Sequence, residues 1–129
     1  MSVQPLEEIE IYILAEAIAD KWWKITSCWK PFAQDTVGEQ LVRAVDSIGA
    51  NIAESYGRYH NDEKINHLYY ARGSLYEAKF FTPRAKQREF VTEDEFNEMI
   101  GDLQMLAPKL NAYIKSKKAH KTNTLLLIH

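Results

Sequence analysis

The chain has 129 residues, one cysteine, 46% hydrophobic residues, only 5 glycines and 4 prolines, and a net charge of −2. A chain of this length can bury roughly two-thirds of its unfolded surface, which predicts one globular domain that needs neither a disulfide nor a metal to hold its core. The slight excess of acid argues against a protein that coats nucleic acid by bulk charge and leaves room only for a local basic patch. An acidic first dozen residues and the lack of a long apolar run favour a cytoplasmic protein without a secretory signal or a membrane span.

The apolar spacing is helical almost throughout the chain. It predicts a first helix over about 6–26, which Pro31 prevents from continuing, and a short connector after it. A second helix should open at Thr36, because Thr36 and Glu39 form a capping-box pattern. Gly57 is a plausible end for this helix.

Asn61 is expected to cap a third helix, which Pro83 should kink or end. Thr92 begins a second capping box and a fourth helix. Pro108 lies inside this last pattern, and we expect a kink there and not a break, because the apolar spacing resumes on both sides.

Four helices of about 20 to 28 residues with short connections predict an all-α fold, an up-down-up-down antiparallel four-helix bundle. The bundle should form a single domain over residues 1–121. The tail 122–129 holds four consecutive apolar residues, so it either docks on a neighbour or is disordered.

The third helix has an apolar arc about twice as wide as a surface helix needs. One row of apolar side chains along this arc can fill the interior of the bundle. The second row is predicted to pack on another copy of the chain, the alternative being that long side chains merely cover the flank. Adjacent Trp22 and Trp23 point about 100° apart and cannot both face one narrow core. The residues assigned to the oligomer interface are Trp23, Ile65, Tyr69, Tyr76 and Phe80.

A polar ribbon follows the second helix beside its apolar stripe. Its members, at steps of four, four and three, are Arg43, Ser47, Asn51 and Glu54. The spacing favours a half-buried hydrogen-bond network that fixes the helix register. A strip that contacts a ligand is the alternative, and no pairing of nucleophile and base supports it.

Di-iron sites in four-helix bundles need two Glu-x-x-His motifs, and neither is present. Glu63, His60 and His67 are expected to form a solvated cluster. No zinc or phosphate-loop motif occurs either. We therefore expect no metal, no cofactor and no enzymatic activity.

Lysines crowd the end of the fourth helix, and no acid follows Leu103. In the predicted topology this end lies beside the turn between the second and third helices. Together they would form a basic patch suited to phosphates and an unstacked base. The alternative is that the helix dipole favours these lysines and the acidic start of the first helix neutralises them. The residues of this nucleic-acid patch are Arg58, Tyr59, Lys64, Lys115, Lys117, Lys118 and Lys121.

Two strings, SIGANIAE at 47–54 and ARGSLYEA at 71–78, carry a resemblance to a known family. The chain resembles the four-helix-bundle family named for open reading frames in intervening sequences of bacterial 23S ribosomal RNA genes. The resemblance implies a small homo-oligomer, pentamers being known, without an established enzymatic activity. A related branch, the accessory variability determinant of diversity-generating retroelements, is a basic pentamer that assists a reverse transcriptase and its template RNA. This chain differs in being slightly acidic and in having Ser55 where the family usually has glycine.

The sequence and the resemblance together predict a non-enzymatic homo-oligomer, a pentamer by resemblance. It would act as an assembly or adaptor protein whose partner is RNA or a protein working on nucleic acid. The alternative is a module that binds nucleic acid directly through the basic patch.

Overall fold

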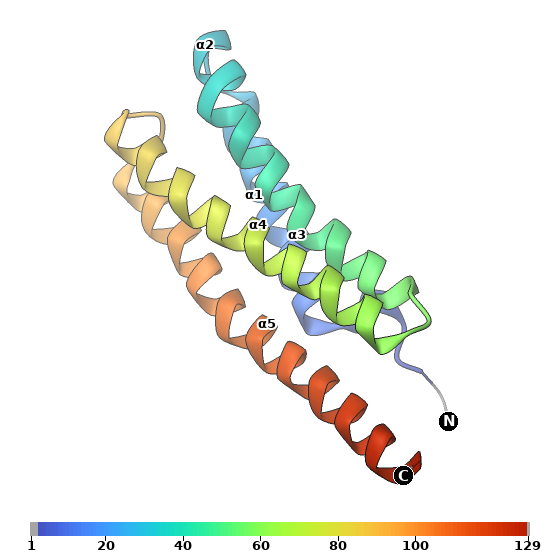
Figure 1. Cartoon of the computed structure of the whole chain (residues 1–129). Helices are drawn as coiled ribbons and strands as arrows, with labels where there is room; N and C mark the ends of the chain where they lie inside the picture. Colours follow the sequence, from blue (N-terminus) through green and yellow to red (C-terminus); the bar gives the residue numbers. More distant parts are fainter. Residues whose placement is uncertain (1–2, 129) are drawn as a thin grey trace.

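Four long helices run up, down, up and down (Figure 1). The computed structural model describes the backbone of residues 3–128 and the side chains of residues 3–120. The long helices are α1 (Glu10–Ser27), α3 (Glu39–Gly57), α4 (Asn61–Gln87) and α5 (Glu93–Ile128). Shorter turns are η1 (Leu6–Glu8), α2 (Pro31–Ala33) and the π-helix η2 (Gln34–Gly38). The predicted all-α antiparallel four-helix bundle is confirmed.

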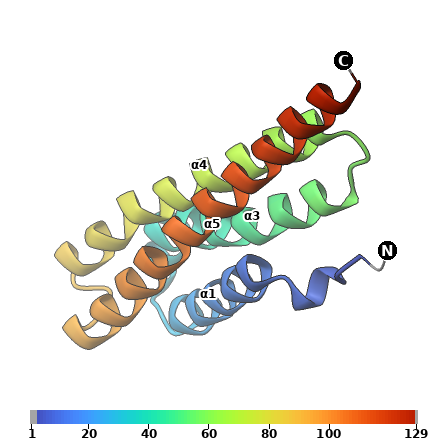
Figure 2. The same ribbon diagram turned by 90° about the horizontal axis from the view of Figure 1, so that it is seen from below.

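The helices follow one another around the core in chain order. α3 packs between α1 and α4, and α5 packs on α4 and closes the bundle against α1. α1 and α4 therefore lie diagonally across the bundle, as the view from below shows (Figure 2). Fully buried side chains from all four helices fill the centre, including Trp22, Leu41, Ile48, Leu75 and Leu106.

The predicted start of the second helix is wrong. Helical structure begins at Pro31 and runs through α2 and η2 into α3 without an extended residue. The Thr36 hydroxyl donates a 2.7 Å hydrogen bond back to the Phe32 carbonyl, so it does not cap the amide of Glu39. Proline fixes a helical φ and lacks only an amide that would be unpaired in a first turn, which places the helix start at Pro31.

The two other predicted caps have opposite outcomes. The capping box at Thr92 is confirmed, because the Thr92 amide donates to Glu95 Oε1 at 2.8 Å and the Glu95 amide donates to Thr92 Oγ1 at 3.1 Å. The cap at Asn61 is wrong. Asn61 is the first residue of α4, and no side-chain hydrogen bond caps that end.

Proline does not end either of the helices that contain it. α4 passes through Pro83 and continues to Gln87, so of the two predicted alternatives, a kink or an end, the end is wrong. Thr82 and Ala85 on either side are fully buried, and this burial offsets the hydrogen bond that a proline removes. α5 likewise runs through Pro108, as predicted, and its backbone stays helical past position 121 to Ile128. The side chains of the 122–129 tail lie outside the described residues.

Gly38 lies where η2 meets α3 and leaves no room for a side chain. A Cβ atom added there would lie 3.0 Å from the Ala33 carbonyl oxygen and 3.3 Å from the Trp29 ring. We expect Gly38→Ala to lower the free energy of unfolding by about 1 kcal/mol in urea, because the overpacking outweighs the gain in helix propensity. Gly101→Ala is the matched control, since its Cβ meets nothing within 4 Å, and it should raise stability by up to about 1 kcal/mol. Equal shifts would contradict the close approach at Gly38.

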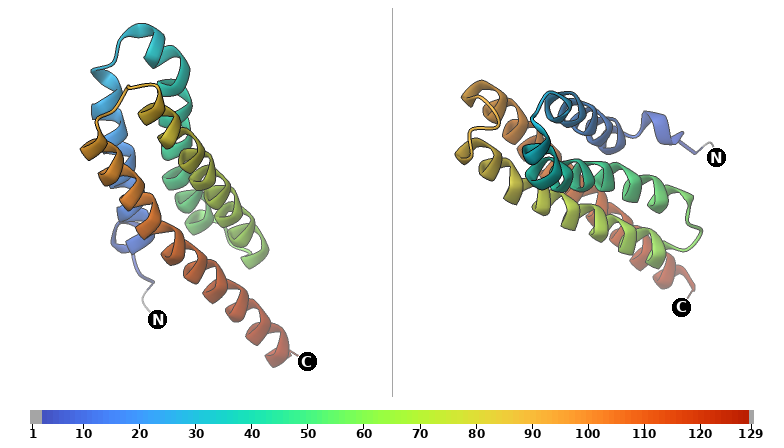
Figure 3. Two further views of the ribbon diagram at one scale, coloured as in Figure 1. Left: turned by 90° about the vertical axis from the view of Figure 1, so that its left-hand side faces the viewer. Right: turned by 90° about the horizontal axis from the view of Figure 1, so that it is seen from above.

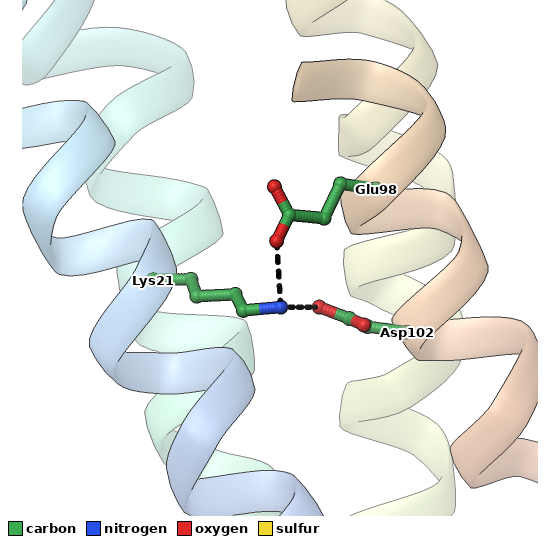
Figure 4. Close-up of polar contacts among 3 residues, drawn as sticks. All are labelled: Lys21, Glu98 and Asp102. Atoms are coloured by element: carbon green, nitrogen blue, oxygen red, sulfur yellow. Dashed lines mark hydrogen bonds and ion pairs between the residues drawn. The ribbon is translucent and has the colours of Figure 1, made fainter. Parts of the chain in front are cut away.

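A lysine of α1 joins α5 at the edge of the bundle. The Lys21 Nζ atom lies 2.9 Å from Glu98 Oε1 and 2.9 Å from Asp102 Oδ2 (Figure 4). Hydrogen bonds to Asp102 and then to Glu98 raise the pKa of Lys21 above its ordinary value of 10.5. The charged form is therefore favoured in the folded chain.

This raised pKa predicts how stability changes at alkaline pH. The contribution of Lys21 is complete below its unfolded pKa and is lost as the pH rises through the folded pKa. We expect Lys21→Gln to cost less than about 1 kcal/mol at neutral pH, since the site is partly exposed, and to flatten the loss of stability above roughly pH 10.5. Thermal unfolding across that range measures it, with exposed Lys24→Gln as control. An unchanged alkaline slope in Lys21→Gln would contradict this role.

Candidate functional site

The structure limits which kinds of site the described residues can form. Among them, no helix is long and apolar enough to cross a membrane. The described residues also contain no group of three His, Cys, Asp or Glu side chains that could hold a metal ion. The candidate sites are surfaces of the bundle.

One side of α4 carries exposed aromatic rings, each with a cation beside it. Tyr76 and Phe80 are 56% and 55% exposed, and Tyr69 is half-buried. The Arg72 guanidinium lies 4.9 Å from the Tyr69 ring centre, Lys79 Nζ 5.4 Å from that of Tyr76, and the Arg84 guanidinium 4.7 Å from that of Phe80. We call these six residues the α4 ridge: Tyr69, Arg72, Tyr76, Lys79, Phe80 and Arg84.

The other two residues of the predicted interface do not join this ridge. Ile65 is only 7% exposed and contributes little to any surface. Trp22 is fully buried and Trp23 is 64% exposed, which confirms that the two neighbours point in different directions. Trp23 lies in a hollow between α1 and α3, away from α4.

That hollow is one of two that lie between α1 and α3, and we call the two together the α1–α3 groove. It consists of hollows of about 360 Å³ and 230 Å³. Its apolar end is lined by Trp23, Thr26, Ser27, Gln34, Gly38, Glu39 and Val42. Its other end is lined by Tyr12, Ala15, Glu16, Ala19, Asp20, Val45, Asp46, Gly49, Ala50 and Ala53. Partial burial and then the charge of Asp20 raise the pKa of Asp46, so the carboxylates here crowd one another.

The polar ribbon of α3 divides into two kinds of contact. Ser74 of α4 donates to Ser47 Oγ at 2.8 Å, and Asn51 donates to the same oxygen at 3.0 Å. A ring nitrogen of His67 lies 3.3 Å from Asn51 Oδ1, so this histidine joins α4 to α3. The expected solvated cluster is wrong for His67, which is half-buried.

The chemistry of this network is structural. His67 meets the amide of Asn51 and neither serine hydroxyl, so the contact lacks the geometry that activates a serine nucleophile. The outer members of the ribbon form ion pairs along their own helix: Arg43 with Glu39 at 3.8 Å, and Glu54 with Arg58 at 3.4 Å.

The C-terminal part of α5 extends past the start of α4 (Figure 3), and Lys117 of α5 lines a hollow together with Lys64 of α4. Lys64 Nζ donates to the carbonyl oxygens of Ser55 at 3.3 Å and Tyr56 at 3.2 Å, and the Ser55 hydroxyl donates to the Lys64 carbonyl at 2.9 Å. Burial and then the positive charge of Lys117 lower the pKa of Lys64. The two lysines are therefore close enough to influence each other.

A hollow of about 380 Å³ opens beside these lysines. Its lining contains no carboxylate and consists of Val3, Gln4, Ile9, Ser55, Tyr56, Lys64, Tyr113 and Lys117. Burial and then Tyr56 raise the pKa of Tyr113, so its hydroxyl keeps its proton well into alkaline solution. This combination can attract an anionic group and donate hydrogen bonds to it.

Other members of the predicted nucleic-acid patch are arranged less uniformly. Tyr59 is 88% exposed, and Lys115 is exposed as well. Lys118 Nζ lies 4.9 Å from the Tyr69 ring centre. Arg58 forms an ion pair with Glu54, which offsets its positive charge. The side chain of Lys121 lies outside the described residues.

The acidic start of the first helix does neutralise one lysine of α5, as the sequence suggests. Lys109 Nζ lies 2.6 Å from Glu10 Oε1. Lys109 is one turn or more before the lysines of the patch along α5. Glu10 therefore neutralises Lys109 and not the lysines of the patch. The hollow that Lys64 and Lys117 line contains no carboxylate, so its lining stays positively charged.

Comparison with known proteins places the chain among others of the same fold. A family model described as 23S rRNA-intervening sequence protein matches residues 7–112. The chain is also similar to a crystal structure of a protein with unknown function from the S23 ribosomal protein family of Bacteroides thetaiotaomicron. The TM-score is 0.73 at 20% identity, over 81% of this chain and 98% of that one, which shows the shared fold alone. A search of curated proteins found no match.

Proposed function

The chain belongs to the family of 23S rRNA-intervening sequence proteins, and from this we propose that it is a non-enzymatic, cytoplasmic homo-oligomer, a pentamer, that serves as an assembly or adaptor protein. Its partner in this proposal is RNA or a protein that works on nucleic acid. The supporting observation is the exposed aromatic surface. Tyr76, Phe80 and Trp23 each leave more than half of their area to solvent although the core is already filled. Aromatic rings of this kind are typical of buried protein interfaces.

Light scattering or sedimentation at micromolar concentration tests the oligomer. We expect a mass of five times the 15.0 kDa chain, independent of concentration near this range. A monomer would contradict the proposal. A stable assembly with another number of subunits would contradict the proposed pentamer but would agree with the proposed homo-oligomer.

A second candidate function is direct binding of nucleic acid at the basic end of the bundle. It is favoured by one observation, the hollow lined by Lys64 and Lys117 without a carboxylate. Cations that contact phosphates release counterions, so binding to a single-stranded RNA should weaken steeply with salt.

Reversal of three charges tests this candidate. The variant Lys115→Glu, Lys117→Glu, Lys118→Glu should abolish RNA binding, because the replaced side chains repel phosphates. Each phosphate contact that is lost should also lower the steepness of the plot of log K against log salt concentration by about 0.7. The matched control makes the same charge change elsewhere, with Lys24→Glu, Lys30→Glu and Lys86→Glu. RNA affinity that is absent at low salt, or that survives the first variant, would rule out the basic patch.

A further inference from the structure

The α4 ridge and the α1–α3 groove lie on opposite sides of the bundle. Arg72 Nη1 donates to Asn111 Oδ1 of α5 at 3.3 Å, and Lys118 of α5 covers the Tyr69 ring. The ridge therefore belongs to the face that α4 shares with α5. The groove lies between α1 and α3, the other two helices of the ring around the core (Figure 2).

The cations of the ridge form no ion pair with any acid that the structure describes. Arg72, Lys79 and Arg84 make no ion pair among the described residues, and each is held over an aromatic ring. Between Tyr69 and Arg84 the sequence contains one acid, Glu77. The ridge is thus a positively charged aromatic surface.

The groove has the opposite charge. Glu16, Asp20 and Asp46 line it, likewise without an ion pair among the described residues, and no lysine or arginine is part of its lining. The lysines of α1 face the other way, because Lys21 and Lys24 line a hollow on the α5 side. Partial burial and then the negative charge of Asp20 raise the pKa of Asp46, and a cation placed beside these two carboxylates would relieve their mutual repulsion.

The shapes of the two surfaces also match. The floor of the groove is built from small residues, Ala15, Ala19, Gly49, Ala50 and Ala53. Small residues allow a helix with large side chains to approach closely. At 1.5 Å per residue, the α1 side of the groove from Tyr12 to Ser27 and the ridge from Tyr69 to Arg84 are each about 22 Å long. Trp23 adds an exposed ring at one end, and tryptophan is the best partner for a cation.

We propose that the α4 ridge of one chain docks in the α1–α3 groove of a second copy. This inference rests on the proposed oligomer and names the two surfaces that form it. Because two different surfaces meet, each chain uses its ridge on one neighbour and its groove on the other. Such a heterologous contact repeats around an axis and closes into a ring when the rotation allows.

Charge reversal tests the pairing. A groove variant, Asp20→Lys with Asp46→Lys, and a ridge variant, Arg72→Glu with Lys79→Glu, should each be monomeric by light scattering. Combining all four changes in one chain should restore the oligomer. Mixing the two variants should join them into assemblies in which the two alternate, because each supplies the charge that the other lacks, but it should not give a closed ring of five, since an odd number of chains cannot alternate. Circular dichroism checks that each variant folds, and Glu8→Lys with Glu63→Lys is the control for changed net charge.

Disulfide trapping tests which surfaces meet. In a Cys28→Ser background, Ala50→Cys lies in the groove, and Gly73→Cys lies on the exposed side of α4 within one turn of Tyr69 and Tyr76. The chain with both cysteines should form a ladder of covalent oligomers on oxidation, and either single variant should form none. A covalent dimer of Gly73→Cys alone would overturn the proposal, because it would mean that ridge meets ridge.

The outcomes separate this inference from the proposed function. A wild-type monomer contradicts the oligomer itself. A wild-type oligomer that survives both charge reversals overturns only the pairing of ridge with groove.

Discussion

Truncation of Trp22 to alanine should lower the free energy of unfolding by about 3 to 5 kcal/mol, which chemical denaturation at one protein concentration would measure. Trp22 is fully buried, and its ring meets Trp29 edge-on with 6.4 Å between centroids. It lies in the core that all four helices share, so their backbones cannot close around the space that alanine would leave.

Two variants serve as controls for this effect. Trp23→Ala removes the same side chain from an exposed position, so it should change the unfolding of a single chain by no more than about 0.5 kcal/mol and instead weaken assembly. Trp22→Phe should cost less than alanine, because Trp22 Nε1 has no hydrogen-bond partner among the described residues and phenylalanine removes this buried donor. If Trp23→Ala destabilised the chain more than Trp22→Ala, the assignment of the core would be wrong.

Replacement of Lys64 by methionine should cost about 1.5 to 3 kcal/mol, the usual loss for hydrogen bonds to a charged group. Methionine keeps an apolar stem but removes the ammonium that holds the carbonyls of Ser55 and Tyr56 at the end of α3. Urea denaturation measures the loss. Lys115→Met is the matched control, since Lys115 is exposed, and it should stay within about 0.5 kcal/mol of the wild type.

The pH dependence of this contribution has the opposite sign to that of Lys21. The pKa of Lys64 is lowered, mainly by burial, so the folded chain releases this proton at lower pH than the unfolded chain. Between the lowered pKa and the ordinary value near 10.5, the titration of Lys64 therefore makes the free energy of unfolding rise with pH. Lys117→Gln removes the neighbouring charge and should not destabilise the chain at neutral pH. A clear loss of stability in Lys117→Gln would contradict the repulsion between the two lysines.

The four helices were predictable from the spacing of apolar residues, because burial on one side is what selects a helix in a bundle. The start of α3 was not. The Thr36 pattern is a sound local signal, but Pro31 sets a helical backbone five residues earlier and the π-helix η2 carries it through. At Pro83 the local rule that proline ends a helix also failed, because the buried residues on both sides of it hold α4 together.

The candidate site was predictable only where it lies on one helix. The rings of the α4 ridge were identified, and the cations beside them follow from spacing, with Arg72 three residues after Tyr69 and Arg84 four after Phe80. The α1–α3 groove depends on how two helices align, which no single stretch of sequence encodes. The same reason hides the contact of His67 with Asn51, 16 residues away.

The order in which the helices contact one another has a consequence for how the chain folds. α3 and α4 are joined by a short turn and share the most extensive contact, whereas α1 reaches α5 through residues as far apart as Lys21 and Asp102. Local contacts form fastest, so the α3–α4 hairpin should fold first and the docking of α1 on α5 should come last. During synthesis, which begins at the N-terminus, α1 must wait for a partner that leaves the ribosome some 80 residues later. Until then its apolar side depends on α3 alone.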